Sequence, residues 1–124
     1  MRKLSIAVVL AGFLASTGLA LAAGPTIKVS PATVLQGYEV RVYGVVPGCA
    51  VGNRVTLLSR AFSHRHEFAG VPSISAEVKA GHKYSKRTVI PARRSPGRYR
   101  ITGRCGGGNL GVTAHVRVTS AYPY

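Results

Sequence analysis

The chain has 124 residues, of which 17 are Lys or Arg and only three are Asp or Glu, giving a formal net charge of +14. It contains no Asp, which excludes a Ser-His-Asp triad and any Asp-containing carboxylate pair. The excess of cations predicts attraction to polyanions and says nothing about the fold.

The N-terminal segment Met1–Ala23 has the three parts of a secretory signal peptide. A positive n-region, an apolar run and a small-residue cleavage site follow in order, formed by Arg2 and Lys3, Leu4 to Leu19, and Ala20-Leu21-Ala22. We expect residues 1–22 to be removed, leaving a protein that is secreted, free or cell-wall associated, with no membrane span. The alternative is an uncleaved anchor, since about 20 apolar residues can span a bilayer.

The rest of the chain is predicted to be one domain, residues 23–119, with a C-terminal tail at 120–124. Its two cysteines, Cys49 and Cys105, are most simply one disulfide in a secreted protein of this size. Closing so long a loop stabilises a chain by ~4 kcal/mol in the chain-entropy model. A nucleophilic cysteine is therefore not expected.

Seven short segments separated by Gly and Pro alternate apolar and polar residues. They are residues 26–30, 38–43, 54–60, 73–79, 84–90, 98–105 and 110–119. In the second, Tyr38 shares one predicted face with Val40 and Val42. In the sixth, the clearest, Tyr99 and Ile101 face inward between outward arginines. No window repeats at helical period, so the chain is predicted to be an all-β sandwich of about seven strands.

Four motifs occur in chain order: Ile27-x-Val29-x-Pro31, Gly37-x-x-Val40-x-Val42, Pro47-Gly48-Cys49, and Pro96-Gly97-Arg98-Tyr99 followed by Cys105-Gly106-Gly107. Together they resemble the small immunoglobulin-like (Ig-like) domains of secreted actinobacterial proteins. The resemblance implies an antiparallel Ig-like sandwich whose disulfide joins the B–C loop to the end of strand F. Gly97-x-Tyr99 also resembles the tyrosine corner of such folds. A flexible Gly-rich turn is expected between strands F and G.

If strands C, F and G are neighbours, as the resemblance implies, their outward positions form one basic face. Those positions are Arg54, Arg60, Arg98, Arg100, Arg104, His115 and Arg117. Guanidinium groups suit phosphate and carboxylate oxygens, so the predicted partner is an anionic polymer or cell-wall surface. Without a recognised motif, no base-specific contact with nucleic acid is expected. The alternative is a solvated face whose charges oppose aggregation.

A second basic cluster, without a predicted geometry, contains Lys79, Lys83, Lys86, Arg87, Arg93 and Arg94. His64-Arg65-His66-Glu67 places two imidazoles two residues apart, and Glu67 or His82 would complete a zinc-like set. Because no second spaced pair of ligands follows, we expect a polar loop between the third and fourth strands, with no metal or cofactor. The three glutamates lie on separate segments, so no catalytic acid–base pair is predicted.

The sequence therefore predicts a monomeric, non-catalytic binding module. One alternative is a carrier for a small hydrophobic ligand. Ig-like apoproteins that carry antitumour chromophores share a Val-x-Pro opening with this chain, although they are typically acidic and have more than one disulfide. The other is an accessory protein-interaction module with an exposed apolar patch, which would include Tyr122 and Tyr124.

Overall fold

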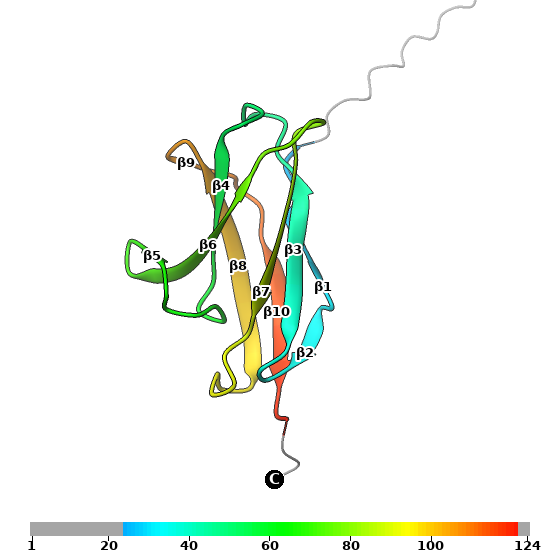
Figure 1. The fold of residues 1–124 in the computed structure, drawn as a ribbon, viewed down its shortest axis with the longest axis vertical. Coiled ribbons are helices and arrows are strands. Elements are labelled where there is room, and N and C mark those ends of the chain that lie inside the picture. The colour runs from blue at the N-terminus through cyan, green and yellow to red at the C-terminus, as the bar shows by residue number, and fades with distance from the viewer. Residues whose placement is uncertain (1–23, 122–124) are drawn as a thin grey trace, which may run out of the picture.

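The computed structural model describes residues 24–121, which form a two-layer β-sandwich (Figure 1). The predicted signal peptide, and Tyr122 and Tyr124 of the predicted patch, lie outside the described residues. The strands are β1 (Lys28–Ser30), β2 (Thr33–Leu35), β3 (Glu39–Val45), β4 (Arg54–Leu58), β5 (Glu67–Phe68), β6 (Val71–Glu77), β7 (Lys83–Val89), β8 (Gly97–Cys105), β9 (Gly108–Asn109) and β10 (Ala114–Thr119). Within residues 24–121, no helix has the length and apolar character needed to cross a bilayer.

The strand order is that of an Ig-like sandwich. One sheet has the order β1-β3-β7, and the other β2-β10-β8-β4-β6-β5, with β9 paired to β8. Only the β2–β10 pair is parallel among the described strands. The chain passes from β1 in one sheet to β2 in the other at Ser30-Pro31, whose peptide bond is cis. The predicted fold class is confirmed, with β4, β8 and β10 as neighbouring strands C, F and G.

The core lies between the sheets and follows the predicted alternation. Val40 and Val42 from β3 are buried against residues such as Val55 and Leu57 from β4 and Ile101 from β8. Between these positions, the side chains of β4, β8 and β10 point away from the core. Period-2 alternation thus turns every basic residue of β8 and β10 to the outside.

Several elements differ from the sequence-based expectation. Strands β2, β5 and β9 are additional, and β10 begins at Ala114 because the chain turns at Gly111, where φ is +81°. Tyr38 is 60% exposed and precedes β3, so it does not share the buried face of Val40. The strand expected at 73–79 is β6, which pairs with β4 and widens the sheet that carries the basic face.

Candidate anion-binding face

Two pairs of basic residues face each other across β8 and β10. Arg98 is paired with Arg117, and Arg100 with His115. All four side chains are exposed on the outer surface of the sheet. Directly opposite residues have Cβ atoms ~4.5–5.5 Å apart, and like charges there are destabilising. The sheet register therefore concentrates positive charge at one place.

Arg60 extends this arrangement from the turn that follows β4. It lines a surface hollow of about 490 Å³ together with Arg98 and Arg100. Apolar Leu58 and Val71 also line the hollow. Five of the seven predicted residues thus gather at one end of the sheet, and we call them the basic cluster: Arg60, Arg98, Arg100, His115 and Arg117.

The other two predicted residues lie on the same face, toward its opposite end, and bind within the protein. The Nε atom of Arg54 donates a hydrogen bond to Ser75 Oγ at 2.7 Å. The Nη2 atom of Arg104 donates to the Gly107 carbonyl at 2.6 Å. The same guanidinium lies 5.3 Å from the ring centroid of Phe68. The predicted seven-residue face therefore divides into an open cluster and two arginines with internal contacts.

The basic cluster has no acidic partner in the described part of the chain. All three glutamates are located elsewhere, each beside another basic residue. The pairs are His64–Glu67 at 3.0 Å, Lys79–Glu77 at 3.3 Å and Arg87–Glu39 at 3.8 Å. These are the only acidic side chains in the sequence, so no side-chain carboxylate neutralises the basic cluster in residues 24–121.

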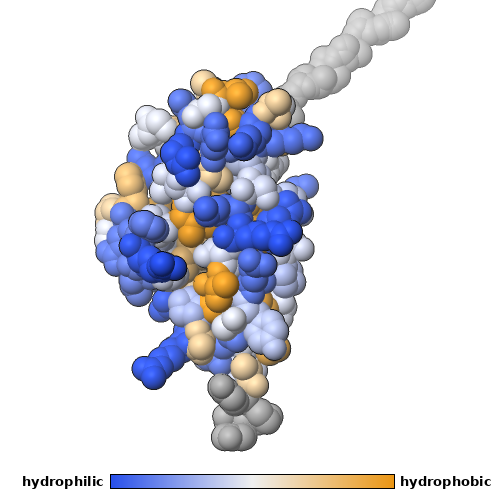
Figure 2. Space-filling model, viewed as in Figure 1, coloured by the Kyte–Doolittle hydropathy of each residue, from blue (hydrophilic) through white to orange (hydrophobic). Residues whose placement is uncertain are grey.

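The outer face of the β1-β3-β7 sheet is also basic. This second basic face was not predicted from the sequence. There Arg41 lies opposite Arg87, but the guanidinium of Arg41 stacks 3.9 Å from the Tyr43 ring centroid and donates to Ser85 Oγ at 3.1 Å. Arg87 lies beside Glu39. Figure 2 shows hydrophilic side chains over much of the surface around β6 and β7, with separate apolar patches among them. On the outer face of the β1-β3-β7 sheet, Arg41 is therefore stacked on an aromatic ring and Arg87 is partly neutralised by a glutamate.

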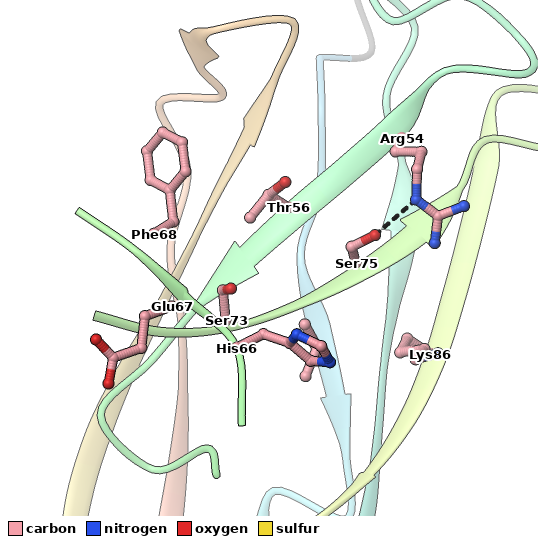
Figure 3. A pocket seen from close by; sticks show the side chains of 9 residues that line it. Arg54, Thr56, His66, Glu67, Phe68, Ser73, Ser75 and Lys86 are labelled. Atoms are coloured by element: carbon pink, nitrogen blue, oxygen red, sulfur yellow. Dashed lines mark hydrogen bonds between the residues drawn. The ribbon is translucent and has the colours of Figure 1, made fainter. Parts of the chain in front are cut away.

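The two predicted histidines make different contacts. His64 Nδ1 lies 3.0 Å from Glu67 Oε2, whereas His66 lines a hollow of about 460 Å³ with Arg54 and Lys86 (Figure 3). Residues 59–66 link β4 to β5, so the predicted polar loop connects strands of one sheet. Across residues 24–121, no group of three or more His, Cys, Asp and Glu side chains is arranged to hold a metal ion.

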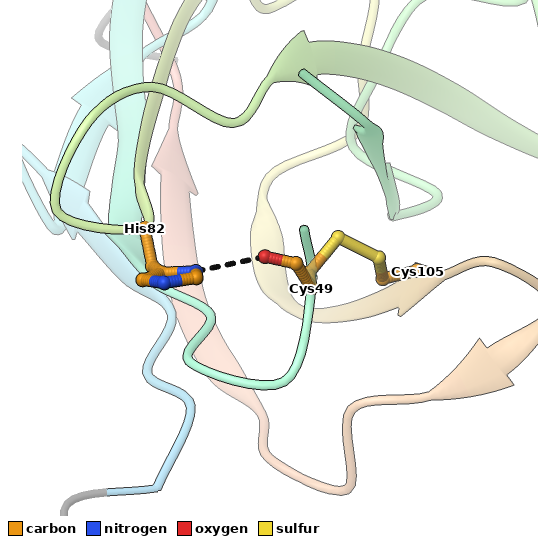
Figure 4. Close-up of a disulfide and its surroundings, with 3 residues drawn as sticks. All are labelled: Cys49, His82 and Cys105. Atoms are coloured by element: carbon orange, nitrogen blue, oxygen red, sulfur yellow. Dashed lines mark hydrogen bonds between the residues drawn. A yellow bond between two sulfur atoms is a disulfide. The ribbon is translucent and has the colours of Figure 1, made fainter. Parts of the chain in front are cut away.

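A disulfide between Cys49 and Cys105 anchors the end of β8, as the resemblance implied (Figure 4). His82 Nδ1 donates a hydrogen bond to the Cys49 carbonyl at 2.9 Å, tying the β6–β7 turn to the same loop. The Gly-rich segment is a tight hairpin, because Gly106 and Gly107 both have positive φ and Cys105 pairs with Gly108. This pairing gives a defined shape to a turn for which the sequence predicts only flexibility.

The entry to β8 is held by the predicted tyrosine corner. The Tyr99 hydroxyl donates to the Ser95 carbonyl at 2.6 Å, four residues upstream. The ring of Tyr99 packs against the core, while its neighbours Arg98 and Arg100 point outward. This anchor lies between two members of the basic cluster and fixes their backbone.

A hollow beside the disulfide bears on the carrier alternative. It measures about 240 Å³ and is lined mainly by small or apolar residues, including Pro25, Val46 and Leu110. Pockets for small organic ligands are typically ~300–1,000 Å³. This hollow is below that range, so its volume does not favour the carrier alternative.

Comparisons with known proteins concern the fold alone. No protein-family model and no curated protein matches the chain. The DNA glycosylase AlkC of Pseudomonas fluorescens, solved bound to DNA containing an abasic site analogue, is 16% identical, with a TM-score of 0.50. The match covers 75% of this chain and 29% of that chain.

Two smaller proteins are similar at TM-scores below 0.5. Macromomycin is 18% identical, with a TM-score of 0.49 over 79% of this chain and 100% of its own. A chain in the titin M10–obscurin-like 1 Ig complex is 19% identical, with a TM-score of 0.41 over 82% and 97%. The strand order itself identifies the chain as an Ig-like β-sandwich.

Proposed function

We propose that this protein is a secreted, monomeric, non-catalytic module that binds anionic cell-envelope or extracellular polymers through the basic cluster. The observation that carries the proposal is the opposition of Arg98 to Arg117 and of Arg100 to His115, with every glutamate beside another basic residue. Secretion rests on the N-terminal segment, and a disulfide is compatible with an oxidising compartment.

Exposed like charges at this spacing raise the energy of the free protein and attract a multivalent anion. A polymer that bridges β8 and β10 would neutralise Arg98, Arg100 and Arg117 at once. The guanidinium groups of Arg60, Arg98 and Arg100 around one hollow would bind a phosphate, sulfate or carboxylate group by paired hydrogen bonds. Such binding is driven largely by charge and weakens steeply with salt.

The test is the affinity of the oxidised secreted protein for heparin and for purified anionic wall polymer between about 50 and 200 mM salt. The test variant is Arg98→Gln/Arg100→Gln/Arg117→Gln. The matched control, Lys28→Gln/Lys83→Gln/Arg87→Gln, removes the same formal charge from the other sheet. Comparing the two separates the position of the charge from its total.

We expect the test variant to lose roughly tenfold or more in affinity. A plot of the logarithm of its binding constant against the logarithm of salt concentration should have a shallower slope. The slope should fall by about one for each arginine that no longer binds an anionic group of the polymer. The control variant should lose much less. Equal losses of affinity in the two variants would show that binding depends only on net charge. An unchanged affinity in the test variant would show that the basic cluster does not bind the polymer.

A further inference from the structure

Strand β7 has one edge without a partner strand. It closes the β1-β3-β7 sheet, and on its free side the described chain offers only the isolated Lys79–Lys83 bridge. The hydrogen bonds Val46 N–H to His82 O and Ile90 N–H to Tyr38 O fix which residues of β7 bond to β3.

Those two bonds place the even-numbered residues of β7 at hydrogen-bonded positions, because antiparallel pairs alternate between bonded and non-bonded. The peptide groups of Ser85 and Arg87 therefore point away from β3, toward the free edge. Each can donate through its N–H and accept through its C=O. This edge can thus extend the sheet by another strand.

Strands β6 and β7 diverge from the turn at residues 78–82 (Figure 1) and belong to different sheets, so β6 does not pair with the free edge of β7. Surface hollows accompany β7 along its whole length. One of about 320 Å³ is lined by Lys83, Tyr84 and Ser85, one of about 460 Å³ by Lys86, and one of about 430 Å³ by Arg87, Thr88 and Val89. An extended segment beside β7 would lie along all three.

The side chains along the free edge of β7 indicate which kind of segment could bind there. Each of the three hollows contains one glutamate, Glu77, Glu67 or Glu39, but seven cations line them: Arg41, Arg54, Arg65, Lys79, Lys83, Lys86 and Arg87. Val89 and Phe68 are exposed apolar residues at 53% and 42%. Basic residues on an edge strand oppose pairing with an identical basic strand, so a second copy of this chain is a poor occupant. An acidic segment with alternating apolar residues matches both the charge and the pleat.

We propose that the free edge of β7 binds an extended acidic segment of a partner protein by β-augmentation. The segment continues the β1-β3-β7 sheet through the peptide groups of Ser85 and Arg87. Its acidic side chains lie beside Lys83 and Arg87 on the outer face. Its apolar side chains lie on the opposite face, toward the hollow where Phe68 and Ile74 lie among seven polar or charged residues. The site is separate from the basic cluster on β8 and β10.

The probe is a capped eight-residue peptide of alternating Val and Glu, titrated into the oxidised, isotope-labelled protein. A second peptide has the same sequence but N-methyl groups on the amides of one edge, which keeps its charge and removes its strand-pairing donors. Two protein variants accompany it. Ser85→Pro removes the outward N–H, which a free edge tolerates, and Ser85→Ala is its control because both lose the hydroxyl that Arg41 contacts.

We expect saturable binding with amide shifts and exchange protection at Ser85 and Arg87. The N-methylated peptide and the Ser85→Pro variant should each weaken binding about tenfold or more, while Ser85→Ala stays near wild type. If Ser85→Pro does not fold, the two peptides decide alone. Equal affinity for both peptides, or shifts confined to β8 and β10, would overturn the proposal.

This inference does not depend on polymer binding, and one further titration tests the two separately. The peptide is also titrated into the Arg98→Gln/Arg100→Gln/Arg117→Gln variant, which keeps the β7 edge but lacks three arginines of the basic cluster. That variant should bind the peptide as the wild type does. Loss of peptide binding there would show that the peptide only follows the charge of the basic cluster, and the β7 edge would be excluded as its site.

Discussion

At the scale of single residues, Gly44 is fixed by the segment that crosses it. A Cβ atom there would collide with the backbone carbonyl of Thr26. That carbonyl accepts the Tyr84 hydroxyl at 2.8 Å, and the Thr26 N–H donates to Val45 O at 2.9 Å. The contact therefore holds the N-terminal segment against both β3 and β7.

We expect Gly44→Ala to destabilise the protein by about 1–3 kcal/mol, the usual cost of overpacking. Gly48→Ala is the control, because a Cβ atom at Gly48 meets nothing within 4 Å. Urea denaturation of the oxidised protein measures both changes. Equal stability of the two variants would show that Thr26 moves aside at little cost.

The burial of Tyr84 predicts how the stability of the protein depends on pH. Burial raises the pKa of its hydroxyl, so the folded state keeps the proton when the unfolded state has lost it. Below the unfolded value of about 10 both states are neutral and the contribution is constant. Above it, stability falls as pH rises.

Tyr84→Phe should therefore be less stable than wild type at neutral pH, by about 1 kcal/mol for the missing hydrogen bond to Thr26. It should also lose less of its stability between about pH 8 and 11. Denaturation midpoints across this range make the comparison. Parallel pH profiles for the two proteins would contradict the effect of burial on Tyr84.

At the scale of elements, the pairing of β8 with β10 opposes Arg98 to Arg117. Relieving this repulsion by Arg98→Gln should stabilise the protein by about 0.2–1 kcal/mol at low ionic strength. The gain should fade near 1 M salt, where the Debye length is about 3 Å. Lys28→Gln is the control, because Lys28 lies opposite Tyr43. A gain from Arg98→Gln that is independent of salt would point to a cause other than charge.

Alternation along the chain predicted the strands that carry the basic cluster, because β4, β8 and β10 each have one buried face. The same signal is absent from β2, β5 and β9, which have only two or three residues. β5 and β9 form short hairpins with their neighbours β6 and β8, and β2 forms by pairing with the distant β10. Nothing in the local sequence places β6 beside β4. The hydrogen bonds that occupy Arg54 and Arg104 also depend on the tertiary structure, so no local pattern separates these two arginines from the basic cluster.

At the scale of the whole molecule, net charge alone does not locate a binding surface. Both outer faces carry cations, but on the β1-β3-β7 sheet Arg41 stacks on Tyr43 and Arg87 lies near Glu39. The basic cluster is exposed and has no acidic neighbour among the described residues. We therefore expect a polyanion to bind at the basic cluster, whereas a partner strand binds through the free backbone edge of β7.

The most direct test of polymer binding is an amide chemical-shift map of the oxidised wild-type protein titrated with a heparin-derived hexasaccharide. We expect the largest shifts at Arg60, on β8 around Arg98 and Arg100, and on β10 around His115 and Arg117. Residues of β3 and β7 should change little. Shifts centred on β3 and β7, or spread evenly over both sheets, would contradict the basic cluster as the polymer-binding surface.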